Sequence, residues 1–409
     1  MEVQKSAGKR EIEKMKHICF IVNRYPNIYE PYMLVFLQRL AWSMADMGKK
    51  VTVICPLQIN LNPEFRKLSY YEREKTEKGE IIEVYRPKTI GLGQSHLILG
   101  KSPVAFTTYF MEKAAEKVLK EMREKPDVLY GHFLAPAGII AVRLGRKFQI
   151  PAFFAFGEAH DTVGQFGAER ACKELRDVCG VIAVSTHMKK QLVHLGVVSE
   201  DKIQVFPNAV DERYFYPHDQ AECREKFGLP ADGILAAFVG SFDERKGIDR
   251  VCLALEQTEG IRLICAGKGD MKPSEAQCVF ARPVAADKIP EFNSAADMFV
   301  LPTLNEGCCN AVVEAMACGL PIISSNLEFN DDILTEECSI RINPNCVEEI
   351  AGAMQLLAND AQKRKSMSEA AVEHAKLFTL NRRARNIISY IDTAIEAMNQ
   401  AKTAVGEER

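Results

Sequence analysis

Two carboxylates eight residues apart mark a segment in the C-terminal part of the chain. Residues 304–323 read LNEGCCNAVVEAMACGLPII, and this pattern predicts a short helix that begins at Asn310 and ends before a Gly-Leu-Pro stop. Glu306 lies in the loop before the helix, and Glu314 lies inside it. A helix that is apolar on nearly every side is normally buried, and a buried carboxylate without partners is costly or takes up a proton. Glu314 is therefore expected to bind something.

The position of Glu314 favours a nucleotide ribose. The preceding MFVLPT reads as a buried strand, so LNEGCCN is the loop at its carboxyl end, where ligands bind in open parallel sheets. Gly307 and the helix N-terminus offer backbone N–H groups that suit a phosphate, and a nearby carboxylate can accept two hydrogen bonds from a vicinal diol. The alternative is a glutamate satisfied by an arginine or by backbone amides, which is commoner for an isolated Glu. A second carboxylate, Glu306, lies in the preceding loop, and this favours a ligand-binding role for Glu314.

A second loop supplies cations. ILAAFVGSFDERKGIDRVCLAL reads as strand, loop and helix, with Arg245 and Lys246 directly before the glycine at the helix start. Cations at this position would neutralise a diphosphate leaving group as its charge develops. Taken alone, such a loop is more often a solvated charge pair.

Length and composition describe a globular protein of about two domains. The chain has 409 residues, of which 47% are hydrophobic and 26% charged. It has no uncharged apolar run of ~18 residues, and its charged N-terminus does not resemble a signal peptide, so we expect a cytoplasmic protein. The 13 cysteines lack metal-ligand spacing and are interpreted as reduced core residues, with a reactive Cys308–Cys309 pair as the alternative.

Charge is distributed unevenly along the chain. Residues 1–205 contain 31 Lys and Arg against 23 Asp and Glu, whereas the remainder is acidic. Two interpretations stay open: chance on solvated surfaces, or a basic half that meets an anionic surface such as the inner face of a membrane.

Short β-rich runs alternate with helical patterns almost to the end of the chain, which predicts an α/β protein with two doubly wound, Rossmann-like domains. Seven strands are expected before the turn-rich segment 207–218, at residues 17–23, 50–56, 81–87, 127–132, 151–157, 180–185 and 202–208. Six more follow it, in ILAAFVG, IRLICAG, QCVFAR, MFVLPT, PIISS and SIRIN. Helices are expected between most of them, for example at 32–47 and 106–123. We place the domains at 1–206 and 207–378, with a C-terminal helix at 379–409 whose apolar stripe must pack on another element.

These motifs resemble the nucleotide-sugar glycosyltransferases of family 4, which have the GT-B fold of two facing domains. The Glu-x7-Glu signature is EGCCNAVVE, PNAVDERYFYP resembles the interdomain linker of the family, VGSFDERKG its phosphate loop, and AADMFVLPTLNEG its lead-in to the first Glu. The resemblance covers nearly the whole chain and is specific in the C-terminal half. It implies a C-terminal helix that crosses back to the first domain.

The resemblance also implies a reaction and a donor site. Sugar transfer would retain the anomeric configuration, through a front-face displacement in which the leaving diphosphate helps to accept the proton. Glu306 would contact the donor sugar, Glu314 the ribose, Lys246 the diphosphate, and the amides from Gly307 to Asn310 the sugar and phosphate.

Three positions depart from the family pattern in or near this site. Ser241, beside Gly240 in the phosphate loop, stands where the family often has Arg, so either Arg245 supplies that charge or binding of the donor is weaker. Ala209 replaces the linker glycine. Arg282 stands where the family has a glycine, next to the expected base pocket.

The N-terminal half is less specific. The family places a His after the strand that corresponds to PAFFAFG, and the GEAHDT loop offers Glu158, His160 and Asp161, of which His160 is favoured. His132 ends another strand and faces the expected cleft, although a lone His there is more often structural. The acceptor would be selected by the first loop, through Arg24, Tyr25 and Glu30.

No cofactor or metal is expected, because the chain contains no Asp-x-Asp pair to hold a divalent ion at the diphosphate. The expected partners are a nucleotide-sugar, UDP-linked by default, and a saccharide or lipid-linked acceptor at the membrane, with no nucleic acid. The product would be a bacterial surface polysaccharide, built by a hexosyl- or N-acetylhexosaminyl-transferase.

The sequence fits three other functions less well. A nicotinamide oxidoreductase requires GxGxxG after the first strand, and IVNRYPNIYE contains no glycine. A non-hydrolysing sugar-nucleotide epimerase shares the fold, but the spacing of Glu306 and Glu314 fits a transferase better. A binding-only relative would not be expected to keep Glu306, Lys246 and Glu314 together.

Overall fold

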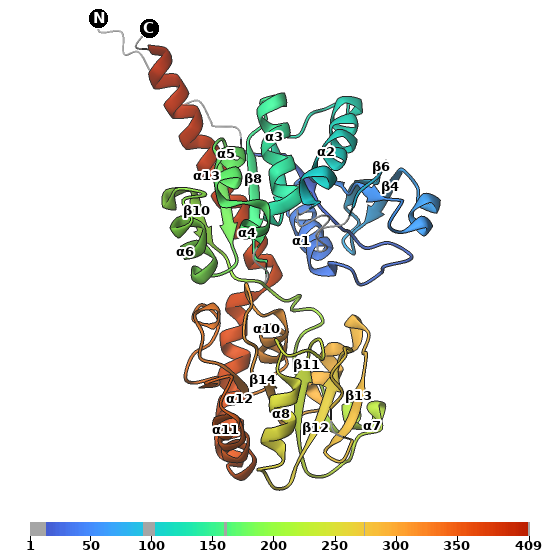
Figure 1. The fold of residues 1–409 in the computed structure, drawn as a ribbon, viewed down its shortest axis with the longest axis vertical. Helices are drawn as coiled ribbons and strands as arrows, with labels where there is room; N and C mark the ends of the chain where they lie inside the picture. The colour runs from blue at the N-terminus through green and yellow to red at the C-terminus, as the bar shows by residue number, and fades with distance from the viewer. Residues whose placement is uncertain (1–13, 93–102, 159–161, 274, 408–409) are drawn as a thin grey trace, which may run out of the picture.

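A computed structural model describes residues 14–92, 103–158, 162–273 and 275–407. It contains an eight-stranded sheet with the order β10-β9-β8-β7-β1-β2-β5-β4 and a six-stranded sheet with the order β13-β12-β11-β14-β15-β16 (Figure 1). We call the parts of the molecule built on these sheets the N-terminal half and the C-terminal half. The predicted GT-B architecture is confirmed, while the domain boundaries at residues 206 and 378 stay predictions.

The N-terminal sheet has apolar side chains on both faces. Its strands are β1 (His17–Ile21), β2 (Lys50–Ile54), β4 (Tyr71–Lys75), β5 (Ile81–Tyr85), β7 (Val128–His132), β8 (Ala152–Phe156), β9 (Gly180–Ala183) and β10 (Ile203–Val205). Because side chains alternate along a strand, Ile18 and Phe20 of β1 lie in a different apolar cluster from Cys19 and Ile21. Helices therefore cover both faces, as parallel sheets require. They are α1 (Val35–Asp46), α2 (Val104–Glu121), α3 (Ile139–Phe148), α4 (Thr162–Phe166), α5 (Ala168–Leu175) and α6 (Thr186–His194).

One strand of this sheet is missing from the sequence-based expectation. β4 reads YEREK, and it pairs antiparallel with β5 at the edge of the sheet. An edge strand that carries charges resists pairing with other chains, so its sequence lacks the apolar run that identified the other strands. Two further short strands, β3 (Leu57–Gln58) and β6 (Lys88–Thr89), form a separate pair.

The C-terminal sheet is parallel throughout and carries the two loops that the sequence singled out. Its strands are β11 (Ile234–Val239), β12 (Ile261–Ala266), β13 (Cys278–Arg282), β14 (Met298–Leu301), β15 (Ile322–Ser325) and β16 (Ser339–Ile342). Its helices are α7 (Gln220–Phe227), α8 (Ile248–Leu255), α9 (Ile289–Ser294), α10 (Asn310–Ala317), α11 (Val347–Asn359) and α12 (Ala361–Ala375). The described helices include none that combines the length and the apolar character needed to span a bilayer.

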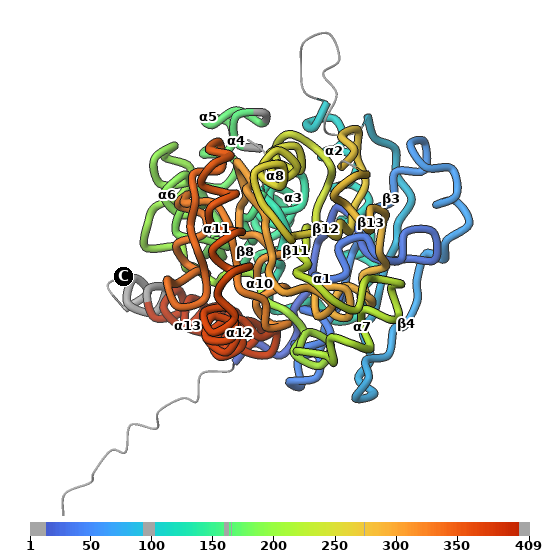
Figure 2. The backbone as a smooth tube through the Cα atoms, turned by 90° about the horizontal axis from the view of Figure 1, so that it is seen from below, coloured from blue at the N-terminus to red at the C-terminus, as the bar shows by residue number. Residues whose placement is uncertain are grey.

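The long last helix, α13 (Leu380–Glu407), crosses back to the N-terminal half, as predicted. It continues from α12 and rises along the side of that half opposite β4 (Figures 1 and 2). Its buried residues Leu380, Ala384, Ile387 and Ile391 join the apolar cluster that contains β1 and α1. At its start, a β-bridge between Val210 and Thr379 places the two chain crossings side by side.

This packing predicts that the N-terminal half depends on α13. Ile387 is fully buried there, so Ile387→Ala should destabilise that half by ~2–5 kcal/mol, the cost of a large-to-small change in a core. The single tryptophan, Trp42 on α1, reports its unfolding by fluorescence in urea. Arg385→Ala is the control, because Arg385 is exposed on the same helix. Equal denaturation midpoints for the two variants would contradict the prediction.

Candidate functional site

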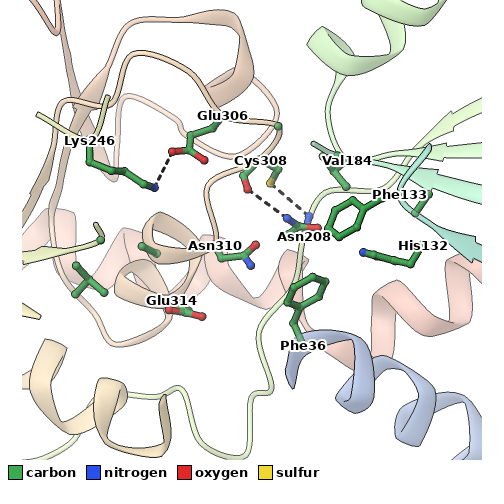
Figure 3. Close-up of a pocket in the computed structure, with 16 residues that line it drawn as sticks. Phe36, His132, Phe133, Val184, Asn208, Lys246, Glu306, Cys308, Asn310 and Glu314 are labelled. Atoms are coloured by element: carbon green, nitrogen blue, oxygen red, sulfur yellow. Dashed lines mark hydrogen bonds and ion pairs between the residues drawn. The ribbon is translucent and has the colours of Figure 1, made fainter. Parts of the chain in front are cut away.

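A cavity of about 340 Å³ lies between the two halves, where carboxyl ends of strands from both sheets meet (Figure 3). Both halves contribute to its wall. The lining residues from the N-terminal half and the linker include Phe36, His132, Phe133, Gly157, Val184 and Asn208, and those from the C-terminal half include Gly240, Lys246, Glu306, Gly307, Cys308, Asn310 and Glu314.

Glu306 and Lys246 form an ion pair in this cavity. The Lys246 Nζ lies 2.6 Å from Oε1 of Glu306, and the same oxygen accepts hydrogen bonds from Arg245 at 2.5 Å and from Thr303 at 3.0 Å. The Lys246 side chain is only 12% exposed. Burial alone would lower the pKa of its ammonium, but Cys309 and Glu306 outweigh that effect and raise the pKa. Lys246 therefore stays protonated and positively charged.

The turn before α8 fixes Lys246. Asp243 accepts a hydrogen bond from the Lys246 backbone N–H at 2.8 Å and another from the Ser241 hydroxyl. Gly247 then takes a left-handed conformation with φ of 80°, where an added Cβ would lie 2.9 Å from the Pro302 carbonyl oxygen. Ser241 thus supports the loop through Asp243 and is not among the cavity-lining residues.

Glu314 is the carboxylate in this cavity that has no direct partner. Among the described residues, none forms a hydrogen bond or ion pair with its side chain, so the expected alternative of a glutamate satisfied by protein groups does not hold. Burial raises its pKa to about 7, although Arg39 of α1 and Lys246 act in the opposite direction. The nearby Asn310 Oδ1 is also buried without a partner. The two groups present acceptors that a ligand with hydroxyl groups would satisfy.

His132 lies across the cavity on the N-terminal half, as predicted. Its ring packs between Phe36 and Phe133, with ring centroids 5.5 and 4.6 Å away. Burial lowers the pKa of His132 to about 3, so the imidazole is neutral, and its Nδ1 is buried without a partner. It can exchange a hydrogen bond with a ligand, but it contributes no charge.

Main-chain groups bring the two halves together beside the ion pair. The Ser185 hydroxyl donates a 2.7 Å hydrogen bond to the Gly307 carbonyl, and the Asn208 side-chain amide donates to the Cys308 carbonyl at 3.2 Å. A Cβ added to Gly307 would lie 2.5 Å from the Gly157 carbonyl oxygen. Gly307 is therefore required for close approach of two backbones, in addition to any role of its amide.

Besides Ser241, three further predicted residues lie away from this cavity. Tyr25 was wrongly placed on the acceptor surface: it is 1% exposed, and its hydroxyl donates to the half-buried Glu74. Arg282 is exposed at the end of β13, with its guanidinium 4.6 Å from the Phe280 ring centroid, so it is not brought to the site. Arg24 forms an ion pair with Glu30 and lines a separate cavity of about 200 Å³ in the N-terminal half.

The structure describes only part of the GEAHDT loop. His160 and Asp161 lie outside the described residues. Glu158 is described, but its two oxygens accept hydrogen bonds from the backbone N–H groups of Leu134 and Gly157, at 2.5 and 3.0 Å. Its carboxylate therefore braces the neighbouring loop, which corrects its placement as a catalytic group. Burial raises its pKa to about 7.

The cysteines beside the site are thiols. Burial raises the pKa of Cys308 to about 12 and that of Cys309 to about 11, so the alternative of a reactive pair fails.

Sequence reasoning missed three residues of this region. Phe36 falls in the helix expected at 32–47 and had no functional signal, and Asn208 was interpreted only as part of a linker motif. Arg39 carried no local signal at all, because its influence on Glu314 arises from the packing of α1 against the linker.

Comparison with known proteins assigns this arrangement to a family. The model of glycosyl transferases group 1 matches residues 219–374, and that of glycosyltransferase family 4 matches residues 34–214, so together they span most of the chain. The chain belongs to glycosyltransferase family 4. It is a glycosyltransferase of the GT-B type that uses nucleotide-sugars, and the comparisons give no support to the epimerase alternative.

Relatives of this glycosyltransferase agree with that assignment. The putative teichuronic acid biosynthesis glycosyltransferase TuaC of Bacillus subtilis is 25% identical over 350 residues, which cover 82% of this chain and 88% of TuaC. A D-inositol 3-phosphate glycosyltransferase of Kribbella flavida is 29% identical over 51% of this chain, and the match spans about half of that relative, 55%. Among solved structures, sucrose-phosphate synthase of Thermosynechococcus elongatus superposes with a TM-score of 0.75 at 18% identity, covering 93% of this chain and all of the other. Anabaena HepE in complex with UDP gives 0.70 at 15% identity, covering 92% and all of the other.

The raised pKa of Glu314 predicts a pH-dependent affinity for the donor. The ionised carboxylate accepts the two hydrogen bonds of a diol more strongly than the protonated acid does, and it ionises around a pH of about 7. Donor affinity, measured by calorimetry, should therefore rise between about pH 6 and about pH 8. Glu314→Gln should abolish this rise. Glu158→Gln is the control, since Glu158 has a similar pKa but its carboxylate is held by the loop. An equal rise in both variants would contradict the assignment.

The same group predicts the opposite trend in stability. The pKa of Glu314 is raised in the folded state from its ordinary 4.5, so the folded state binds more protons, and stability falls as pH rises from about 4.5 through about 7. Glu314→Gln removes this cost. Its Tm should exceed that of the unaltered protein at about pH 8 and match it at about pH 4.5. A variant that melts early at pH 8 yet binds donor normally would indicate a core role instead.

Proposed function

We propose that this glycosyltransferase moves a hexose or N-acetylhexosamine from a UDP-sugar to a saccharide or lipid-linked acceptor, with retention of configuration, in surface polysaccharide synthesis. The observation that carries the proposal is the Lys246–Glu306 ion pair beside the unpartnered Glu314 in one cavity between the halves. UDP and a polysaccharide product are supported by the UDP complex of HepE and by the role named for TuaC.

Donor binding can proceed by exchange of ion-pair partners. A diphosphate that enters the cavity meets Lys246, the nearby Arg245 and the N-terminus of α10, which begins at Asn310. When Lys246 turns to the diphosphate, Glu306 loses one of the donors to Oε1 and can accept hydrogen bonds from the sugar. Glu314 then accepts the ribose hydroxyls. Because Lys246 and Glu306 are already largely buried as a pair, the desolvation cost of these two groups is met before the donor arrives, and only the charge of the diphosphate is newly buried.

The N-terminal wall supports a front-face reaction. Retention through a covalent intermediate needs a carboxylate or similar nucleophile on the opposite face of the sugar. The described residues on that wall are neutral, and Glu158 has both oxygens engaged by backbone amides. In the proposed step the acceptor oxygen bonds to the anomeric carbon as the carbon–phosphate-oxygen bond breaks, and the acceptor proton passes to the leaving diphosphate. The products are the glycoside and UDP.

The stereochemical outcome tests this function. The protein is incubated with α-linked UDP-sugars and a panel of saccharide and lipid-linked acceptors, and the product is analysed by NMR. The proposal expects UDP release that depends on acceptor and an α-linked product. A β-linked product would exclude retention, and interconversion of donor sugars without acceptor would favour the epimerase alternative.

Replacement of the three charged residues, Glu314, Glu306 and Lys246, should change the kinetics in three different ways. Glu314→Ala removes a bond to a ribose that does not react, so it should raise the donor KM by roughly 10- to 100-fold, the value of a hydrogen bond to a charged group. Glu306→Ala should mainly lower kcat, because it touches the sugar whose charge changes in the transition state. Lys246→Ala should impair both. Lys268→Ala is the control, because Lys268 is exposed and does not line the cavity. Identical effects of all three changes on KM alone would contradict these roles.

We also propose that the basic N-terminal half docks on an anionic membrane surface to reach a lipid-linked acceptor. Helix α2 presents Phe106 and Tyr109, which are 42% and 52% exposed, near Lys113 and Lys117. Amphipathic helices with this composition bind at lipid interfaces. Residues 5–16, KSAGKREIEKMK, are rich in Lys and Arg and are a second candidate contact, but they lie mostly outside the described residues.

Vesicle binding tests the docking proposal. The protein should sediment with anionic vesicles at low salt, release at high salt, and sediment less with neutral vesicles. Phe106→Ser combined with Tyr109→Ser should weaken the binding several-fold. Leu253→Ser is the control, since Leu253 is 48% exposed on α8 of the C-terminal half. Equal sedimentation with neutral and anionic vesicles would reject the proposal.

A further inference from the structure

The start of α6 forms two short polar contacts with the C-terminal half. The Thr186 backbone N–H and the Thr186 hydroxyl each donate a 2.6 Å hydrogen bond to the Asp332 carboxylate, one to each oxygen. Asp332 belongs to the C-terminal half and follows the short helical turn η5 (Glu328–Asn330). Hydrogen bonds to an ionised carboxylate are stronger than those between neutral groups, and the N-terminus of α6 adds a favourable dipole.

This contact stands beside the proposed donor site. Ser185, the residue before Thr186, caps α6 by accepting a hydrogen bond from the Met188 N–H, and its own hydroxyl donates to the Gly307 carbonyl at 2.7 Å. Gly307 follows Glu306 directly in sequence. Two consecutive residues of the N-terminal half therefore hold two loops of the C-terminal half, and one of these loops carries the carboxylate paired with Lys246.

Neighbouring ion pairs cannot replace this contact. Glu328 also reaches across the halves, to Lys190 at 3.3 Å and to His187 at 3.4 Å. These side chains are largely exposed, and exposed ion pairs contribute little because water and salt screen them. The carboxylate of Asp332, with both oxygens engaged by one residue, is a more directional contact than these ion pairs.

We propose that Asp332 is a positioning residue of the transferase. Its carboxylate binds the start of α6 when the halves close, and this holds the Glu306–Gly307 loop against the N-terminal wall in the geometry that the reaction needs. The inference rests on the proposed function for the reaction itself, and it adds the residue that fixes the closed arrangement. The donor is bound largely by C-terminal groups, so Asp332 acts on turnover and not on donor affinity.

Four variants isolate this contact. Asp332→Asn keeps the shape but removes the charge, and Thr186→Val keeps the backbone donor but removes the hydroxyl. Thr186→Ser retains both donors and should restore activity. Asp331→Asn is the matched control, because the adjacent Asp331 pairs with Arg341 inside the C-terminal half.

The expected result separates positioning from folding. Asp332→Asn and Thr186→Val should lower kcat by roughly 10- to 100-fold, the value of a hydrogen bond to a charged group, while Thr186→Ser and Asp331→Asn stay near the unaltered protein. The dissociation constant for UDP, measured by calorimetry, and the Tm should match those of the control. Small-angle scattering with UDP bound should show a larger radius of gyration for Asp332→Asn than for Asp331→Asn.

Several outcomes would overturn the inference. They are an unchanged kcat in Asp332→Asn, a loss of UDP affinity as large as the loss of kcat, or equal radii of gyration for the two Asn variants. Failure of the proposed function is recognised separately, because it would leave the unaltered protein without acceptor-dependent UDP release. The scattering comparison would then still decide whether Asp332 holds the halves together.

Discussion

The ion pair between Lys246 and Glu306 is the interaction on which the site depends. Either charge alone would be expensive to hold in a half-buried cavity, and removal of one partner would leave the other uncompensated. Paired, they stay charged in the absence of substrate, and Arg245 and Thr303 fix the carboxylate at one oxygen. The pair thus keeps Lys246 positively charged to bind the diphosphate, and it keeps Glu306 ionised to accept hydrogen bonds from the sugar. Glu314 differs because it has no direct partner, and the cost of burying its charge raises its pKa.

The placement of these charges depends on how the two halves are joined. The linker and the start of α13 run side by side through the Val210–Thr379 bridge, and Arg383 on α13 donates hydrogen bonds to the carbonyl oxygens of Phe206 and Pro207. Two adjacent crossings restrict relative motion of the halves more than a single linker would. Because α13 is also part of the apolar core beneath β1, the crossing cannot slide without exposing buried side chains.

Much of the fold could be predicted because both faces of the sheets are covered, which makes each central strand a continuous apolar run. The same rule did not identify β4, an edge strand in which Tyr71, Arg73 and Lys75 are exposed and Glu74 is turned inward. The donor loops could be predicted because each has its strand and its charged residues in one short segment of sequence. Glu306, Lys246 and Glu314 do line one cavity. Tyr25 was misplaced because its environment is not local. Its hydroxyl meets Glu74, a residue of β4 that also accepts from Trp42, so a tyrosine in a polar loop becomes core.

Glu158 and Glu314 show why a sequence cannot separate a structural carboxylate from a binding one. Glu158 comes directly after β8, Glu314 lies on α10, and burial raises the pKa of each to about 7. The difference is that backbone N–H groups satisfy Glu158, whereas Glu314 faces the cavity. The contacts between the halves beside this cavity, from Ser185, Thr186 and Asn208, are polar. Polar interfaces between domains part more readily than apolar ones. A transferase that must release a nucleotide after each turnover needs such an interface, since a large apolar contact would hold the product in the closed cleft.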